Sequence, residues 1–248
     1  MSSRRVLELS LIILFWLTGQ RDIFKFAGDF APLISIVYGL MLLGIVGLKP
    51  GWWNRLCEQR LIIGGLFALT AAVAILIVYP YADGLKYSMR GSDQDDAVMI
   101  CGQALLSGEF PYLQRTYFGN PASPAPGMLL LFMPSIISGW YPLTTLLALV
   151  ATVVFLTRQT DGQHSTTFIA YLSLSLLFWD HLSVGSDLIV LGLLVLITTK
   201  LSSTAQNQRD VIVVAVLSGL LGATRSVFAF FPLMYAFIGW QRSRKQGL

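Results

Sequence analysis

Long uninterrupted runs of apolar residues constrain the fold of this chain more than any other feature of its sequence. Residues 31–48 and 61–79 contain no charged side chain, and neither does the stretch 116–157. A helix that crosses a bilayer needs about 20 mostly apolar residues, so such runs are typical of membrane spans. A soluble domain carries about 25% charged residues, whereas this chain carries 12%. The sequence therefore predicts an all-α polytopic membrane protein.

The order of these runs predicts about eight or nine transmembrane helices in one domain that covers residues 1–248. No internal repeat or low-complexity linker divides the chain. Arg225 interrupts the last apolar run, and a charge in mid-bilayer is costly. We therefore expect two short helices that turn at Arg225 rather than one long tilted helix. The expected spans are residues 6–17, 31–48, 61–79, two within 116–157 that are separated near 139–142, then 166–179, 188–199, and one or two within 211–240.

Cationic residues predict how the spans are oriented. Lys and Arg beside membrane spans remain on the cytoplasmic side, and here they gather at both termini and in the loop 49–60. We therefore expect an integral protein of the bacterial plasma (inner) membrane, with the loop 80–125 on the extracytoplasmic face. Cys57 and Cys101 would then face opposite sides, and they have no metal-binding spacing. No basic stripe with interleaved aromatic residues occurs, so no nucleic-acid partner is expected.

The loop 80–125 is the one long polar stretch of the sequence, and its centre predicts a short amphipathic helix. Ser92 is a good N-cap, and Asp95 three residues later completes a capping-box-like pair. Gly108 is expected to end the helix. An amphipathic helix that follows a span on the outer side should lie flat on the membrane, with its acidic start above the lipid. Its apolar face is expected to comprise Ala97, Ile100, Cys101, Ala104 and Leu105.

Asp93 and Asp96 lie three residues apart, on neighbouring positions of one helical turn. Clustered carboxylates at a water–lipid boundary have raised pKa values and can accept a proton. We therefore predict that at least one of these two residues is catalytic. The alternative is that the three aspartates of this turn only cap the helix and favour its dipole, which accounts well for Asp95.

A proline-rich segment, residues 120–127, follows the polar loop. Three prolines within six residues exclude a helix and a central strand. The segment is therefore expected to be stiff and extended. Two interpretations stay open: a fixed wall of a site opposite the Asp93 helix, or a rigid connector to the next span.

Four groups of short motifs follow one another along the chain. They are Gly91-Ser92-Asp93 with Asp95-Asp96-Ala97, residues 104–108 and Pro111-Tyr112; residues 117–121 and 126–130; Gly185-Ser186-Asp187; and residues 219–225 with Pro232. Together they resemble the GT-C glycosyltransferases, membrane enzymes that use polyprenyl-phosphate sugars as donors. In turn, they resemble the first outer loop of that class, the segment after it, its Gly-Gln-Asn or Gly-Asn-Asp element, and its Gly-x-x-x-Gly-x-x-x-x-Lys segment before a proline-containing helix.

The resemblance covers residues 79–240 and implies a mannosyltransferase-like, inverting enzyme that works on the extracytoplasmic face. It implies that Asp93, or next Asp96, acts as the general base or positions the acceptor hydroxyl, and that Arg225 binds the donor phosphate. Sugar transfer independently needs such a base and such a cation at the height of the lipid headgroup. Arg90 and Arg115 are alternative phosphate partners. The other expected substrate-binding residues are Asp95, Asn120, His181 and Asp187.

No metal ligand is assigned, and no cofactor is expected beyond the lipid-linked donor, although a need for a divalent metal stays open. Two other functions compete with transfer. A transporter or flippase of a lipid-linked molecule could line its path with Arg225 and Asp187, but transporters often show internal repeats, which this sequence lacks. A non-catalytic subunit that lends its groove to a partner membrane subunit would suit the short chain, and Ser186 stands where the class often has a polar amide.

Overall fold

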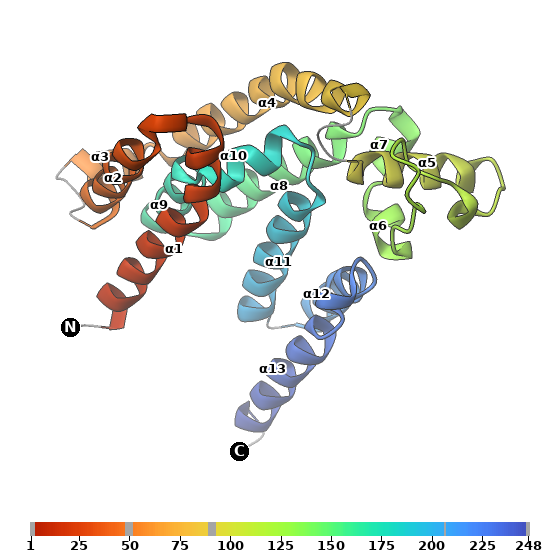
Figure 1. The fold of residues 1–248 in the computed structure, drawn as a ribbon. Helices are drawn as coiled ribbons and strands as arrows, with labels where there is room; N and C mark the ends of the chain where they lie inside the picture. Colours follow the sequence, from red (N-terminus) through yellow and green to blue (C-terminus); the bar gives the residue numbers. More distant parts are fainter. Residues whose placement is uncertain (1–2, 48–51, 89–92, 206, 247–248) are drawn as a thin grey trace. The chain divides into compact units, whose positions relative to one another are not determined.

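The computed structural model describes residues 3–47, 52–88, 93–205 and 207–246, and over these residues the chain is all-α (Figure 1). The described residues form thirteen α-helices, which are joined by short 3-10 or π turns and by loops. Within the described ranges there is no strand, and the one β-type pairing is an isolated bridge between Arg115 and Pro121. The predicted fold class is therefore confirmed as all-α.

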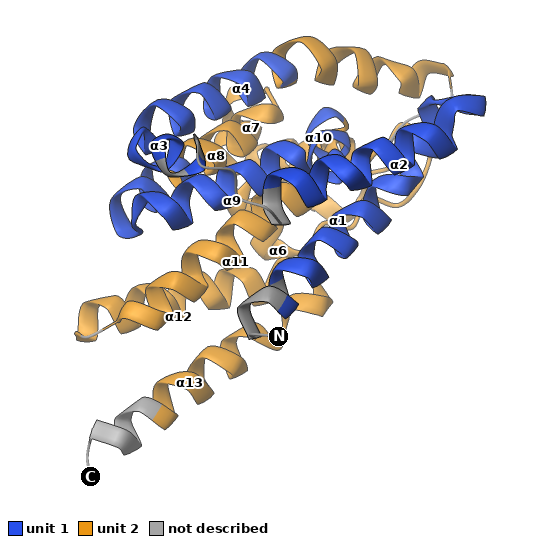
Figure 2. Ribbon diagram, turned by 90° about the vertical axis from the view of Figure 1, so that its left-hand side faces the viewer, with its two compact units in different colours: residues 1–74, 153–183 blue, residues 75–152, 184–248 orange. Residues whose placement is uncertain are grey.

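Two compact units divide the chain (Figure 2). Unit 1 comprises residues 1–74 and 153–183, and unit 2 comprises residues 75–152 and 184–248. Unit 1 contains α1 (Ser3–Phe26), η1 (Gly28–Phe30), α2 (Ala31–Leu42), η2 (Leu43–Gly47), α3 (Trp52–Glu58), most of α4 (Arg60–Gly84), α9 (Gly162–Leu174) and α10 (Leu176–Ser183). Unit 2 contains η3 (Leu85–Ser88), α5 (Gln94–Leu106), η4 (Pro111–Leu113), α6 (Pro126–Leu131), α7 (Met133–Ser138), most of α8 (Pro142–Gln159), α11 (Asp187–Thr204), α12 (Gln208–Gly222), η5 (Ser226–Phe228) and α13 (Phe231–Gln246).

Among the residues that the structure describes, four helical segments are long and apolar enough to cross a membrane. They are Gly28–Ile45, Arg60–Ser88, Pro142–Gln159 and Asp187–Thr204, and Ser226–Gln241 is a shorter apolar helix. Each of the four overlaps one of the runs from which a span was predicted. Length and composition therefore fit a multi-pass membrane protein, while the full predicted count of eight or nine spans stays a prediction.

Two of the predicted spans are broken into shorter helices. The first half of the run 116–157 forms α6 and α7, six residues each, which meet at Phe132. A helix of six residues is about 9 Å long. The hydrocarbon core of a bilayer is about 30 Å thick, so neither helix can cross it alone. Pro134 near the start of α7 cannot continue the hydrogen-bond ladder of α6. Likewise, Ser175 adopts extended backbone and separates α9 from α10.

The predicted turn at Arg225 is confirmed. Helix α12 ends at Gly222, Arg225 has extended backbone (φ −149°, ψ 147°), and η5 leads into α13, which packs against α12. The chain therefore makes a helical hairpin, and Arg225 sits at its turn rather than in the middle of a helix.

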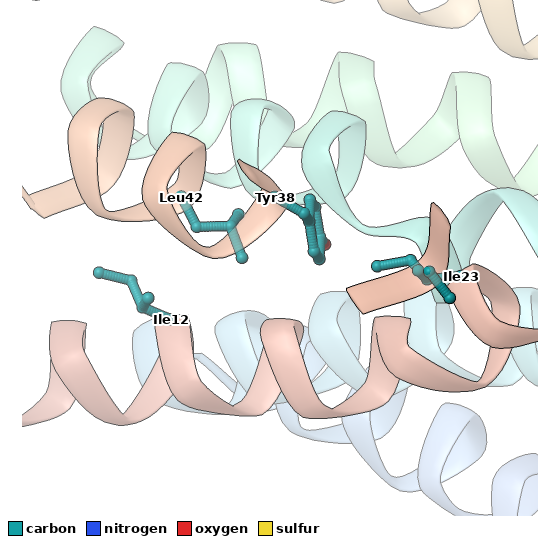
Figure 3. Packing of buried hydrophobic residues seen from close by; sticks show 5 residues of the cluster. Ile12, Ile23, Tyr38 and Leu42 are labelled. Atoms are coloured by element: carbon teal, nitrogen blue, oxygen red, sulfur yellow. The ribbon is translucent and has the colours of Figure 1, made fainter. Parts of the chain in front are cut away.

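Helices α1 and α2 form the core of unit 1 and pack face to face (Figure 3). Ile12 and Ile23 of α1 meet Tyr38 and Leu42 of α2, and all four side chains are buried. The hydroxyl of Tyr38 donates a hydrogen bond to the carbonyl oxygen of Leu174 at 2.8 Å. This bond satisfies the polar end of a buried aromatic side chain.

Unit 2 packs the polar region against short helices. Helix α5 contacts α6, α7 and η4, and its buried positions include Val98, Cys101 and Ala104. Protein therefore covers Cys101 and Ala104 of the predicted apolar face, while the flat position of this helix on the membrane stays a prediction. Leu105, expected on the same face, is 44% exposed. The face is rotated because Asp95 and Val98 also turn inward.

Gly127 joins α6 to the end of α12, and we predict that it tolerates no side chain. Its N–H donates to the carbonyl oxygen of Ala223 at 3.0 Å, and a Cβ there would lie 2.6 Å from the carbonyl carbon of Ala223. Because backbone cannot move aside cheaply, Gly127→Ala should destabilise the protein by about 1–3 kcal/mol. Thermal melting of the purified protein measures this loss.

Gly192→Ala is the matched control, because no atom lies within 4 Å of a Cβ built at Gly192 in α11. Alanine favours a helix over glycine by about 0.8–1.0 kcal/mol, so this change should raise the melting temperature slightly. Equal melting temperatures for the two variants would contradict the close packing of α6 on α12.

Candidate functional site

A cavity of about 440 Å³ lies in unit 2, between the start of α5, the proline-rich segment and the turn from α12 to α13. It brings together four residues predicted from the sequence, Asp93, Asn120, Asp187 and Arg225, which come from separate segments of the chain. The remaining lining residues are Gln94, Ala97, Val98, Thr116, Pro121, Ser123, Pro124, Ala125, Met128, Thr224, Ser226 and Val227. A basic and an acidic side chain that were predicted to act together therefore line one cavity.

Asp93 is the N-cap residue of α5, and two side chains hold its carboxylate. Thr116 Oγ1 and Asn120 Nδ2 both donate to Asp93 Oδ2, at 2.6 and 2.9 Å. Partial burial opposes ionisation, but these two hydrogen bonds outweigh it and hold the pKa of Asp93 below its ordinary value. The predicted raised pKa is therefore wrong for Asp93, whose carboxylate is a fixed, ionised acceptor near neutral pH.

The loop that carries Thr116 and Asn120 is a tight turn. Gly119 adopts a positive φ of 78°, which favours glycine, and the N–H of Thr116 donates to the carbonyl oxygen of Asn120 at 2.9 Å. Pro121 and Pro124 follow and line the same cavity. The proline-rich segment thus forms a wall of the cavity opposite the start of α5. This position fits the first of the two interpretations that the sequence left open.

Arg225 and Asp187 form a two-pronged ion pair at the cavity. Arg225 Nε and Nη2 reach Asp187 Oδ2 at 3.0 and 2.7 Å, and Nη2 reaches Oδ1 at 2.8 Å. The side chain of Asp187 is 5% exposed, whereas that of Arg225 is 39% exposed. A planar guanidinium held along one edge keeps a fixed orientation. Asp187 therefore occupies the Nε–Nη2 edge of the guanidinium, and Nη1 is the nitrogen that makes none of these contacts.

Backbone geometry at the start of α11 puts Asp187 in place. Gly185 has a positive φ of 66°, and a Cβ there would lie 2.5 Å from the ring of Tyr79. Ser186 caps α11 through its side chain, which accepts from the N–H of Leu188 at 3.4 Å. The three residues of the Gly-Ser-Asp motif thus have different roles. Gly185 allows close packing against Tyr79, Ser186 caps α11, and Asp187 pairs with Arg225.

A second acidic group lies between the end of α4 and the first turn of α5, and it does not line the cavity. Oxygens of Asp83, Asp95 and Asp96 lie within 4.8 Å of one another, and within the described residues no other set of three or more acids, histidines and cysteines comes this close. Lys86 Nζ contacts Asp83 Oδ1 at 2.8 Å and Asp96 Oδ1 at 2.7 Å. Lys86 thus supplies the positive charge that a metal ion would supply, and we assign no metal ligand here.

Asp95 is buried, and the capping role predicted for it is wrong. Its Oδ2 accepts a 2.5 Å hydrogen bond from the hydroxyl of Tyr79, so the side chain turns toward α4 instead of the helix start. Ser92, the predicted capping partner, lies outside the described residues. Burial, together with the charges of Asp83 and Asp96, raises the pKa of Asp95 to about 6, despite the hydrogen bond from Tyr79 and the charge of Lys86.

The other predicted site residues are not at the cavity. Asp96 is paired with Lys86. Arg115 is exposed, and its Nη1 donates to the carbonyl oxygen of Gly119 at 2.9 Å. His181 belongs to α10 in unit 1, and Arg90 lies outside the described residues. Of the two predicted catalytic aspartates, only Asp93 lines the cavity.

Three residues that matter to this arrangement escaped the sequence analysis. Thr116 orients Asp93, Tyr79 binds Asp95, and Lys86 pairs with Asp83 and Asp96. Thr116 has no local signal, because a threonine in a loop is unremarkable. Tyr79 resembles an ordinary interfacial aromatic residue at the end of a span. Lys86 had one signal, its i,i+3 spacing from Asp83, which is compatible with a surface pair.

The cavity can bind a hydroxyl group and an anionic group side by side. An ionised carboxylate accepts a hydrogen bond or a proton, and an oriented guanidinium stabilises negative charge on a phosphate. Compared with known proteins, the chain matches no family model, no curated protein and no solved structure.

Proposed function

We propose that this chain transfers a sugar from a polyprenyl-phosphate donor to an acceptor hydroxyl on the extracytoplasmic face of a bacterial plasma membrane. The observation that carries the proposal is that Asp93 and Arg225, which are 132 positions apart (225 − 93), line one cavity. The resemblance to GT-C glycosyltransferases supports the same assignment of these two residues. The proposal includes eight or nine spans, counting the short helices as part of the membrane domain.

In this mechanism Asp93 acts on the acceptor. Its carboxylate takes the proton of the hydroxyl as the acceptor oxygen bonds to the anomeric carbon of the donor sugar. The bond between that carbon and the phosphate oxygen breaks on the opposite side, which inverts the anomeric configuration. Thr116 and Asn120 hold Asp93 through Oδ2, so the carboxylate is oriented before the substrate arrives.

Arg225 acts on the leaving group. The departing phosphate changes from a diester with one negative charge to a monoester that gains a second. A guanidinium stabilises this developing charge, and the ion pair with Asp187 fixes the plane of the Arg225 side chain. No covalent sugar–enzyme intermediate is required, because one carboxylate and one cation complete a single displacement.

The direct test is turnover by the purified full chain in lipid nanodiscs. A polyprenyl-phosphate mannose is offered with simple glycoside acceptors, and release of polyprenyl phosphate and formation of the glycosylated product are both measured. Inverted product is expected, and the Asp93→Asn variant is the blank. Donor binding without any turnover across a panel of donor sugars would favour a non-catalytic subunit. Movement of intact donor across sealed vesicles would instead favour a flippase.

A further inference from the structure

The Asp83–Asp95–Asp96 group packs two segments of unit 2 together. Asp83 and Tyr79 come from the end of α4, Lys86 from η3, and Asp95 and Asp96 from the first turn of α5. Tyr79 bonds to Asp95, and Lys86 bonds to Asp96. These two contacts hold the first turn of α5, which also carries Asp93, against the end of α4.

The charges in this group do not balance. Three carboxylates share the single ammonium of Lys86, so full ionisation leaves a formal charge of −2. Asp95 is 4% exposed, and its Oδ1 is buried and has no hydrogen-bond partner among the described residues. An ionised carboxylate with a buried, unpaired oxygen is costly, whereas a proton on that oxygen removes both the charge and its repulsion.

No further described cation offsets this excess. The titratable groups that face Asp95 are Tyr79 and Asp83 from α4, Lys86 from η3, and Asp96 from its own helix, and Tyr141 before α8 also senses its charge. Helices α6 and α7 contribute no titratable side chain, and Tyr112 of η4 is exposed. Within the described residues, a proton is therefore the remaining way to lower the negative charge.

We propose that the Asp83–Asp95–Asp96 group is a proton-binding lock: one proton, carried by Asp95, holds the first turn of α5 against α4, and loss of that proton loosens it. The lock itself does not depend on the proposed function. Its effect on transfer does rest on that function, because the same turn positions Asp93 in the cavity.

The sign of the pH dependence follows from the pKa of Asp95, which is about 6 in the folded protein against an ordinary value of 3.8. A group whose pKa is raised by folding contributes stability at low pH and loses it as the pH rises through the folded value. Opening of α5 should therefore become easier between pH 5 and pH 7. These two pKa values give an opening equilibrium about tenfold larger at pH 7 than at pH 5.

Cys101 reports this opening directly. It lies in α5, is fully buried, and donates through Sγ to the carbonyl oxygen of Pro111 at 3.1 Å. In a Cys57→Ser background, Cys101 is the single thiol of the chain. The rate of maleimide labelling of this parent at pH 5 and pH 7 is compared with the rate in a variant that also carries Asp95→Asn. The amide of that variant has the shape of the protonated acid and cannot titrate.

The ratio of the two labelling rates, parent over Asp95→Asn, should rise about tenfold from pH 5 to pH 7. Taking the ratio cancels the ionisation of the thiol itself. Glu109→Gln, an exposed acid after the same helix, should track the parent at both pH values. A ratio that stays constant would overturn the lock. So would protection of Cys101 by Mg²⁺ or Mn²⁺ at pH 7 in the parent alone, because the group would then hold a metal ion.

Two precautions keep this result interpretable. If Asp95→Asn does not fold, the labelling rate of the parent is divided by that of a free thiol of similar pKa. The same tenfold rise of this ratio from pH 5 to pH 7 is then expected, and Glu109→Gln should show it as well. The assay uses no sugar donor and no acceptor. Failure of the lock therefore leaves the proposed transfer untouched, and absence of transfer leaves the labelling result untouched.

Discussion

Asp93→Asn is expected to lower the rate of sugar transfer by at least about 100-fold, the lower end of what a positioned general base contributes. The amide keeps the size of the side chain, and its carbonyl oxygen can still accept from Thr116 and Asn120. The variant therefore loses the proton acceptor but keeps the local structure. Turnover at saturating donor and the melting temperature are measured on the same preparation, and the melting temperature should change little.

Asp96→Asn is the matched control for this variant. Asp96 lies three residues later on α5 but pairs with Lys86 and does not line the cavity. Its replacement should lower stability and leave turnover within a few fold of the parent. If Asp96→Asn were inactive and Asp93→Asn nearly normal, the base would have to be Asp96. Normal turnover in both variants would end the carboxylate proposal.

Arg225→Gln is expected to lose both donor affinity and stability. Loss of a hydrogen bond to a charged group costs about 1.5–3 kcal/mol, which corresponds to donor binding weaker by about 10- to 150-fold. The sequence alone suggests little change in stability, because removal of a charge near the membrane relieves a desolvation cost. The structure changes this expectation, since Asp187 is 5% exposed and would lose its partner.

The size of the stability loss follows from the burial of the pair. Removing one partner of a fully buried ion pair costs about 3–5 kcal/mol. Because Arg225 is 39% exposed, solvent already screens part of the interaction, and we expect about 2–3 kcal/mol. Thermal melting and donor binding, measured on one preparation, give both quantities.

The double variant Arg225→Gln with Asp187→Asn separates the two effects. The buried carboxylate is gone, and the two amides can bond to each other, so most of the lost stability should return. Donor affinity should stay low, because no cation faces the phosphate. Donor affinity equal to that of the parent in both variants would make Arg225 structural, and the phosphate site would then have to be sought around Arg115 and Arg90.

Local signals in the sequence predicted the fold class and four of the residues that line the cavity. Apolar runs of span length predicted the all-α fold, and the cost of a charge in mid-helix predicted the turn at Arg225. The same signals failed for residues 126–138, where the apolar composition is that of a span but Pro134 divides it into α6 and α7. Composition reports how apolar a segment is, whereas the position of a proline decides whether it is one helix.

The partners of the charged residues were set by tertiary structure alone. Thr116 and Asp93 are 23 positions apart, Asp95 and Tyr79 are 16 apart, and Arg225 and Asp187 are 38 apart. Helical periodicity relates residues three or four positions apart, so it cannot reveal these pairs.

The consequence is largest for the aspartates at the start of α5, which look alike in the sequence. Packing gives Asp93 two hydrogen-bond donors and a pKa below its ordinary value, and it buries Asp95 among other carboxylates and raises its pKa. The sequence by itself determined which charges this protein carries and that its chain is helical, and only the tertiary structure decided which of those charges meet, because that depends on how segments distant in the chain pack together.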